Sequence, residues 1–168
     1  GVLDPLGPGS TPRVILQAGE SKSDALSRML ADARHASRLR RVFAELSGRS
    51  LTGKPALEVG FQRRAAGADC QPATAAAPVD PAKGLAPCDQ LWVSFANVSG
   101  KPQDVSILYL NADFTVTPIW PKGLSNRLMP GESARAGLQI APNLPPAIEE
   151  LLVLAVPARD DGARVDLT

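Results

Sequence analysis

The fold is decided by residues 91–120, which read LWVSFANVSGKPQDVSILYLNADFTVTPIW. This segment contains three mostly apolar runs: residues 91–98, 105–110 and 114–120. Gly100 and Pro102 lie in the turn after the first run, where glycine tolerates a positive φ and proline fixes φ. Side chains in the second run are expected to alternate between two faces. The pattern therefore predicts short β-strands joined by tight turns.

Similar strand signals lie on both sides of this segment, at residues 57–62, 134–140 and 151–156. The last of these is apolar at every position, which predicts a central strand covered on both faces. Residues 13–17 and 165–167 are further strand candidates. Short strands with frequent turns predict a mainly β chain of the α+β class. We expect an antiparallel β-sandwich of immunoglobulin-like character.

One amphipathic helix is predicted before the strands. Its apolar residues recur at helical spacing: Leu26, Met29, Leu30, Ala33, Leu39, Val42, Phe43 and Leu46. Ser21 or Ser23 can cap its start, and Asp24 suits the positive end of the helix dipole. Gly48 stands just beyond the last apolar residue, which predicts that it ends the helix.

Arg34, Arg38 and Arg41 are predicted to share the opposite face of this helix. They can hold an acidic partner or a nucleic-acid backbone, and a plain solvated face is the competing interpretation. The chain has 18 Lys and Arg against 17 Asp and Glu, a net charge of +1. Because nucleic-acid-binding domains usually carry a strong basic excess, we expect no nucleic-acid partner and favour a protein. The sequence indicates no oligomeric state.

Residues 65–87 are rich in Ala and Pro and show no periodicity, so we predict a loop or linker. It would separate residues 1–64, a helix-and-strand segment packed on or next to the sandwich, from a β-sandwich domain at residues 88–168. Cys70 and Cys88 flank the linker. They either form a disulfide or remain two free thiols, and a disulfide would favour the periplasm or secretion over the cytoplasm.

No catalytic, cofactor or metal site is expected. His35 is the only histidine and lies in the predicted helix, so no base-and-nucleophile pair is evident. Zinc sites use about four ligands, and two cysteines with one histidine do not supply them. The acids Glu149, Glu150 and Asp113 are the residues on which an enzyme hypothesis would rest, and we regard that hypothesis as the weakest.

No apolar run approaches the roughly 18 residues of a membrane-spanning helix, so we expect no membrane span. No signal peptide is evident at the start. The chain begins with Gly1 rather than Met, which we interpret as a processed or excised piece of a longer protein.

The second half of the chain resembles the C-terminal β domain of bacterial caspase-family (metacaspase-like, peptidase C14-type) proteins. The resemblance rests on turn and strand motifs: Asn97, Ser99 and Gly100; Val105 to Tyr109; Pro121 and Gly123; Asn126, Arg127 and Leu128; Pro130 and Gly131; and Glu150 to Ala155. It implies a non-catalytic accessory domain that interacts with its own peptidase domain or with another protein.

The catalytic motifs of that family are not matched. The family has a His-Gly pair and a Cys in an Asp-x-Cys context, whereas this chain has no His-Gly pair, and Asp69-Cys70 is followed by Gln-Pro. No catalytic residue is therefore carried over. The alternative function is a stand-alone envelope or secreted β-sandwich binding domain, stapled by a disulfide.

Overall fold

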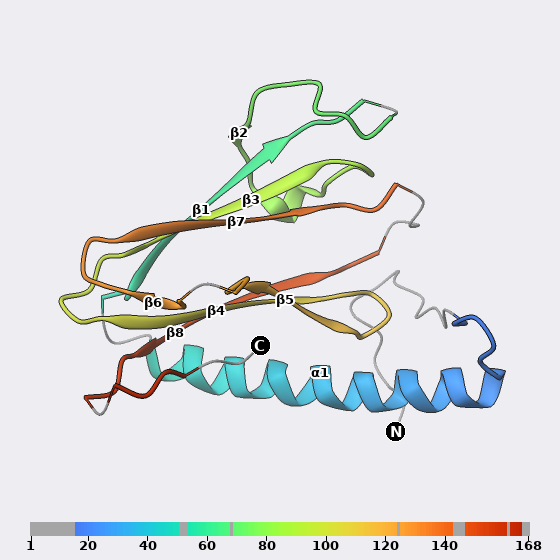
Figure 1. Cartoon of the computed structure of the whole chain (residues 1–168), viewed down its shortest axis with the longest axis horizontal. Coiled ribbons are helices and arrows are strands. Elements are labelled where there is room, and N and C mark those ends of the chain that lie inside the picture. Colours follow the sequence, from blue (N-terminus) through green and yellow to red (C-terminus); the bar gives the residue numbers. More distant parts are fainter. Residues whose placement is uncertain are drawn as a thin grey trace. The chain divides into compact units, whose positions relative to one another are not determined.

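The computed structural model describes residues 16–50, 54–67, 69–123, 125–142, 147–160 and 162–165 (Figure 1). Within these ranges the chain forms one α-helix, one 3₁₀ turn and eight strands. The elements are α1 (Lys22–Ser50), β1 (Leu57–Arg64), β2 (Ala77–Pro78), η1 (Pro81–Lys83), β3 (Gln90–Asn97), β4 (Gln103–Leu110), β5 (Val116–Trp120), β6 (Arg127–Leu128), β7 (Ser133–Gln139) and β8 (Glu150–Pro157). The prediction of a mainly β, α+β chain with one helix is confirmed.

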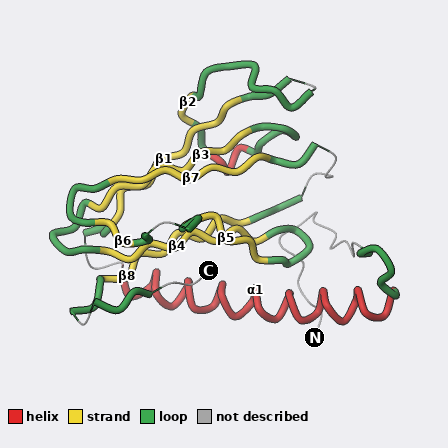
Figure 2. The backbone as a smooth tube through the Cα atoms, viewed as in Figure 1, coloured by secondary structure: helices red, strands yellow, loops and turns green. Residues whose placement is uncertain are grey.

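The strands form two four-stranded sheets (Figure 2). The first has the order β2-β1-β3-β7. In the second, β4 is the central strand, which pairs with β5, β6 and β8. β1 and β3 are antiparallel along their whole length, from Leu57 opposite Asn97 to Arg64 opposite Gln90. β3 and β7 are also antiparallel.

The chain divides into two compact units. The first comprises Gly1–Gly53, Ile107–Pro118 and Pro146–Leu154, and the second comprises Lys54–Ser106, Ile119–Pro145 and Ala155–Thr168. The boundaries pass through β4, β5 and β8, so these strands contribute residues to both units.

The second unit is a β-sandwich-like structure. Leu91, Val93 and Phe95 of β3 are buried on one face of the first sheet. Phe95 meets Trp120 of the second sheet edge-to-face, with ring centroids 5.4 Å apart. Further buried side chains of this unit are Val105, Ile119, Leu128 and Ala136. Aliphatic residues therefore make most of this core, as expected from an aromatic content of 4%.

Asn97, at the end of β3, ties two turns of the second unit together. Its side-chain amide donates to the carbonyl oxygens of Lys101 and Leu128, both at 2.9 Å. Its Oδ1 accepts from the backbone N–H and the hydroxyl of Ser99. Gly131 donates its N–H to the carbonyl of Asn97 and has φ +81°, which glycine adopts without strain. The turns at residues 99–101 and 129–132 are thus held by one buried side chain.

The prediction that residues 151–156 form a central, fully covered strand is wrong. In the described residues β8 pairs only with β4, and all its side chains from Glu150 to Val156 are half-buried. The strand that is buried on both faces is β4, in which only Tyr109 is partly exposed. Among the residues of β8, Leu152 packs against the cluster that contains Ala33 and Ala36 of α1 and Leu108 and Leu110 of β4.

Two other expectations are corrected. Gly48 lies inside α1, which runs on to Ser50, so it does not end the helix. Glycine costs only about 1 kcal/mol relative to alanine within a helix, which one position in a long helix tolerates. The candidate strands at residues 13–17 and 165–167 fall partly outside the described residues, and their described members, Leu16, Gln17 and Val165, are not in strands.

Residues 65–87 contain β2, η1 and several hydrogen-bonded turns. β2 pairs with β1, placing Pro78 opposite Gln62. Val79 donates its N–H to the carbonyl of Phe61 at 3.1 Å, and Ala73 donates to that of Ala65 at 3.0 Å. The described part of this segment therefore returns along β1.

Candidate functional site

The start of α1 is fixed by side-chain hydrogen bonds. Ser21 is the N-cap, because its hydroxyl oxygen accepts the N–H of Asp24 at 3.2 Å. The same hydroxyl donates to the Asp24 carboxylate at 2.7 Å. Just before the helix, Glu20 accepts two hydrogen bonds from Arg28, at 2.9 and 3.0 Å. The Arg28 guanidinium lowers the pKa of Glu20 to about 2.

α1 packs in the first unit through small side chains. Ala33 and Ala36 are buried together with Leu108 and Leu110 of β4 and Phe114. The partly buried side chains around this cluster are Met29, Leu39, Phe43, Val116 and Leu152. Alanine has the smallest side chain that still favours a helix, so it lets the helix backbone lie close to the strands.

The exposed apolar residues of α1 correct the prediction of a single apolar face. Leu26 and Val42 are 47% exposed and Leu30 is 36% exposed. One residue corresponds to about 100° of rotation around a helix, so Leu26 follows the fully buried Ala25 and points away from the core. The spacing of the alanines marks the buried row, and that signal was available in the sequence.

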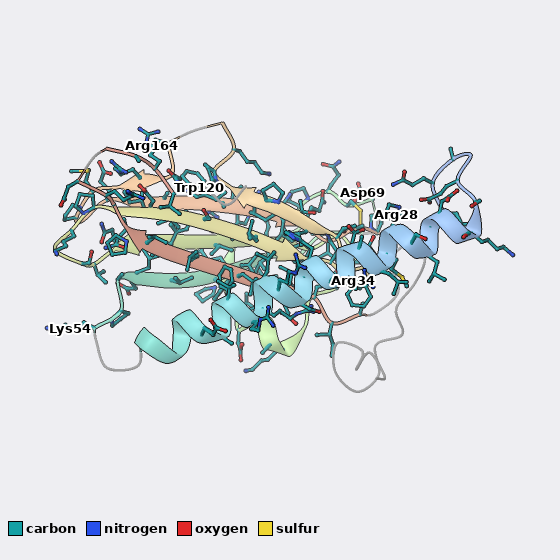
Figure 3. All side chains as sticks on the ribbon, turned by 90° about the horizontal axis from the view of Figure 1, so that it is seen from below. Arg28, Arg34, Lys54, Asp69, Trp120 and Arg164 are labelled. Atoms are coloured by element: carbon teal, nitrogen blue, oxygen red, sulfur yellow. A yellow bond between two sulfur atoms is a disulfide. The ribbon has the colours of Figure 1, made fainter. Side chains whose placement is uncertain are left out.

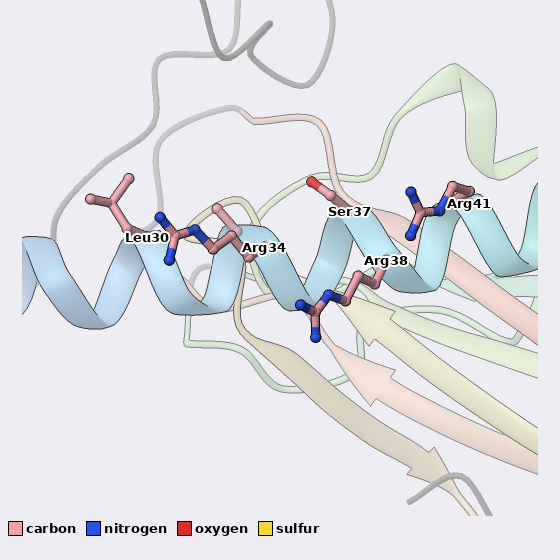
Figure 4. A pocket seen from close by; sticks show the side chains of 6 residues that line it. Leu30, Arg34, Ser37, Arg38 and Arg41 are labelled. Atoms are coloured by element: carbon pink, nitrogen blue, oxygen red, sulfur yellow. The ribbon is translucent and has the colours of Figure 1, made fainter. Parts of the chain in front are cut away.

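Arg34, Arg38 and Arg41 are exposed, as expected. However, Leu30 lies on the same side of the helix as these arginines and not opposite them. Together with Leu30, Ala33 and Ser37 they line a shallow hollow on the helix (Figure 4). Among the residues that the structure describes, none of these three arginines forms an ion pair.

We call Leu26, Leu30, Arg34, Arg38 and Arg41 the α1 outer face. From residue 26 to residue 41 it extends about 22 Å along the helix at 1.5 Å per residue. Figure 3 shows the position of Arg34 on this helix and that of Arg28 closer to its start. The face combines exposed aliphatic carbon with three guanidinium groups, so it offers both apolar contact and hydrogen-bond donors to carboxylates.

The acids named for an enzyme hypothesis have separate partners in the first unit. Glu149 accepts from the hydroxyl of Tyr109, and burial together with this carboxylate raises the pKa of Tyr109. Glu150 accepts from Arg40 Nε at 2.9 and 2.8 Å. Asp113 accepts from the backbone N–H and the hydroxyl of Thr115.

His35 is an exposed residue of α1. Across the described ranges, no three side chains of His, Cys, Asp or Glu gather as a metal ion would require. No helix among the described residues is both long and apolar enough to cross a membrane.

Cys70 and Cys88 form a disulfide in the second unit. Both half-cystines have positive φ, 60° and 71°, in the left-handed region that non-glycine residues rarely adopt. The side-chain amide of Gln139 donates to both of their carbonyl oxygens, at 3.2 and 3.3 Å. Cys70 is thereby joined to Gln139 at the end of β7 as well as to Cys88, two residues before β3.

Comparison of the chain with protein-family models, with curated proteins and with solved structures finds no match. The α1 outer face and the motifs of the second half of the chain are the features of this protein that bear on its function.

Proposed function

We propose that this chain is a non-catalytic interaction domain of a bacterial caspase-like cysteine peptidase, and that the α1 outer face binds a protein partner. The observation that carries the interaction role is the hollow on α1, where Leu30 stands beside three exposed arginines. The caspase-like context is supported by the motifs between residues 91 and 156 that resemble the accessory β domain of that family.

The partner surface is acidic with apolar side chains among its carboxylates. Burying a leucine side chain contributes about 1.5–3 kcal/mol, whereas an exposed ion pair contributes about 1 kcal/mol or less. Leu26 and Leu30 would therefore supply most of the affinity. Arg34, Arg38 and Arg41 would orient the partner and speed association by long-range attraction.

The first test is the gene that encodes this chain. The proposal expects a region with a caspase-like His and Cys pair in the same protein. If the full-length gene encodes no such region, the peptidase assignment fails.

The second test measures binding of the peptidase region, expressed as a separate chain, by titration calorimetry. Arg34→Glu/Arg38→Glu/Arg41→Glu and Leu26→Ser/Leu30→Ser should each weaken binding at least about tenfold, a loss of roughly 1.4 kcal/mol. Lys54→Glu/Lys83→Glu/Lys101→Glu is the matched control, since it changes the net charge equally at three exposed lysines. It should leave the affinity within about threefold.

Two results would contradict this role of the α1 outer face. One is equal weakening by the arginine and lysine variants, which would reduce the effect to net charge. The other is arginine-dependent binding to vesicles containing anionic lipid with no binding to the peptidase region, which would make the face a membrane-surface helix.

A second candidate function is a stand-alone envelope or secreted β-sandwich binding domain. The observation that favours it is the disulfide between Cys70 and Cys88. The test is a thiol assay on denatured protein from its native compartment. Two reactive thiols would remove this candidate, whereas a blocked pair combined with a gene that lacks a peptidase region would favour it.

A further inference from the structure

A buried ion pair in the second unit joins β4 to β6. The carboxylate of Asp104 accepts hydrogen bonds from Arg127 Nε at 2.8 Å and from Arg127 Nη2 at 3.0 Å. The Asp104 side chain is completely buried and that of Arg127 is 20% exposed. Asn126, next to Arg127, is also buried, and its carbonyl accepts the N–H of Val105 at 2.8 Å.

These three side chains hold the C-terminal segment by its backbone. Asn126 Nδ2 donates to the carbonyl of Val165 at 2.7 Å, and Arg127 Nη2 donates to the carbonyl of Ala163 at 2.9 Å. In the other direction, the N–H of Val165 donates to Asp104 Oδ2 at 3.0 Å. The contacts alternate along the segment in the way that a neighbouring strand would make them.

The segment itself offers little apolar anchoring. Ala163 and Arg164 are exposed and Val165 is only half-buried. The side chains of Asp104, Asn126 and Arg127 thus hold this surface segment through its backbone N–H and C=O groups. Every residue except proline has both of these groups. An arrangement of this kind recognises an extended backbone rather than a particular side-chain sequence.

We propose that Asp104, Asn126 and Arg127 form a binding site for an extended peptide segment with a non-proline residue at the position of Val165. Residues Ala163–Val165 are its resident occupant, and a segment supplied by another chain can take their place. This site goes beyond the proposed interaction role and does not depend on the α1 outer face, so either can fail without the other.

The test uses a chain that ends at Asp160 and a fluorescein-labelled peptide of residues 162–168, GARVDLT. Anisotropy should show saturable binding to the shortened chain. The full-length chain should bind at least about tenfold more weakly, because its own segment occupies the site.

Matched peptides show which groups are recognised. Val165→Pro removes the N–H donated to Asp104 and should weaken binding about tenfold, whereas Val165→Ile keeps that N–H and should bind within about threefold. Arg164→Ala should also bind within about threefold, because the site contacts the backbone on either side of it. A loss beyond about tenfold for Arg164→Ala would overturn recognition through the backbone.

A second protein keeps the test decisive if the shortened chain does not fold. The full-length Val165→Pro variant retains every residue but cannot make the bond to Asp104, so its site should accept the labelled peptide. Circular dichroism establishes which variant is folded. If the folded variants give no saturable binding up to about 1 mM peptide, Asp104, Asn126 and Arg127 only fasten the chain's own segment and the proposal is wrong.

Discussion

The guanidinium of Arg127 and the carboxylate of Asp104 face each other through two hydrogen bonds, at 2.8 and 3.0 Å. The Asp104 side chain is completely buried, so solvent does not compensate its charge. A buried carboxylate without a cationic partner lowers the stability of the folded chain. The stability of the second unit therefore depends on the charge of Arg127 as well as on its hydrogen bonds.

Arg127→Met should lower the free energy of unfolding by about 3–5 kcal/mol, because it leaves the Asp104 charge buried without its cation. Urea unfolding followed by tryptophan fluorescence measures this. Arg135→Met is the control, since Arg135 lies over the Trp92 ring at 4.2 Å on the outside of the sheet. Its loss should cost about 1 kcal/mol or less, and equal losses for the two variants would contradict a special role for the buried pair.

The same pair predicts how stability depends on pH. Hydrogen bonding from Arg127 lowers the pKa of Asp104 in the folded chain. In the unfolded chain an aspartate titrates near about 3.9. A lowered folded pKa means that the contribution of Asp104 is fully present above the unfolded pKa and is lost as pH falls through the folded pKa.

The difference in unfolding free energy between the original chain and Asp104→Asn isolates this contribution, since the asparagine does not titrate. It should stay constant between about pH 5 and 7 and shrink as pH falls below about 4. A difference that grows on acidification would show that the sign is wrong.

The Cys70–Cys88 disulfide should stabilise the second unit by restricting the unfolded chain. The two half-cystines are 18 residues apart. Closing a loop of about 15 residues contributes roughly 3 kcal/mol in the chain-entropy account. Cys70→Ser/Cys88→Ser should therefore lower the melting temperature, and dithiothreitol should lower that of the original chain equally while leaving the double variant unchanged.

Much of the sandwich follows from local sequence. β3, β4 and β7 begin and end within about two residues of the predicted strands, because alternation and turn residues act over a few positions. The exposure of Arg34, Arg38 and Arg41 also follows from helical spacing.

Long-range features were not predictable in the same way. An apolar run such as Leu151–Val156 shows that its side chains are covered, but it does not show how many strands pair with it. A strand with one pairing partner can also be apolar where a helix packs on it, as α1 does near Leu152. Asp104 gave no sequence signal of its own, since its partners Arg127 and Val165 lie 23 and 61 residues away.

Packing of α1 through alanine predicts an unequal response to enlargement. Ala36 is completely buried in the cluster with Leu108 and Leu110. Ala36→Leu should destabilise the chain by about 1–3 kcal/mol, because the added carbons have no space without moving the helix. Ala31 is exposed on the same helix, so Ala31→Leu should change stability by about 0.5 kcal/mol or less. Thermal and urea unfolding compare the two.

Truncation of Leu30 and of Leu108 should have different effects on stability, because Leu30 is exposed and Leu108 is in the core. Leu30 is 36% exposed, whereas Leu108, which belongs to the buried cluster, is 2% exposed. Leu108→Ala should cost about 2–5 kcal/mol of unfolding free energy, as truncation of a core leucine does. Leu30→Ala removes the same atoms from a position that solvent already reaches, so it should cost clearly less, about 1 kcal/mol. A comparable loss for both would place Leu30 in the core and leave Leu26 and the three arginines to bind a partner.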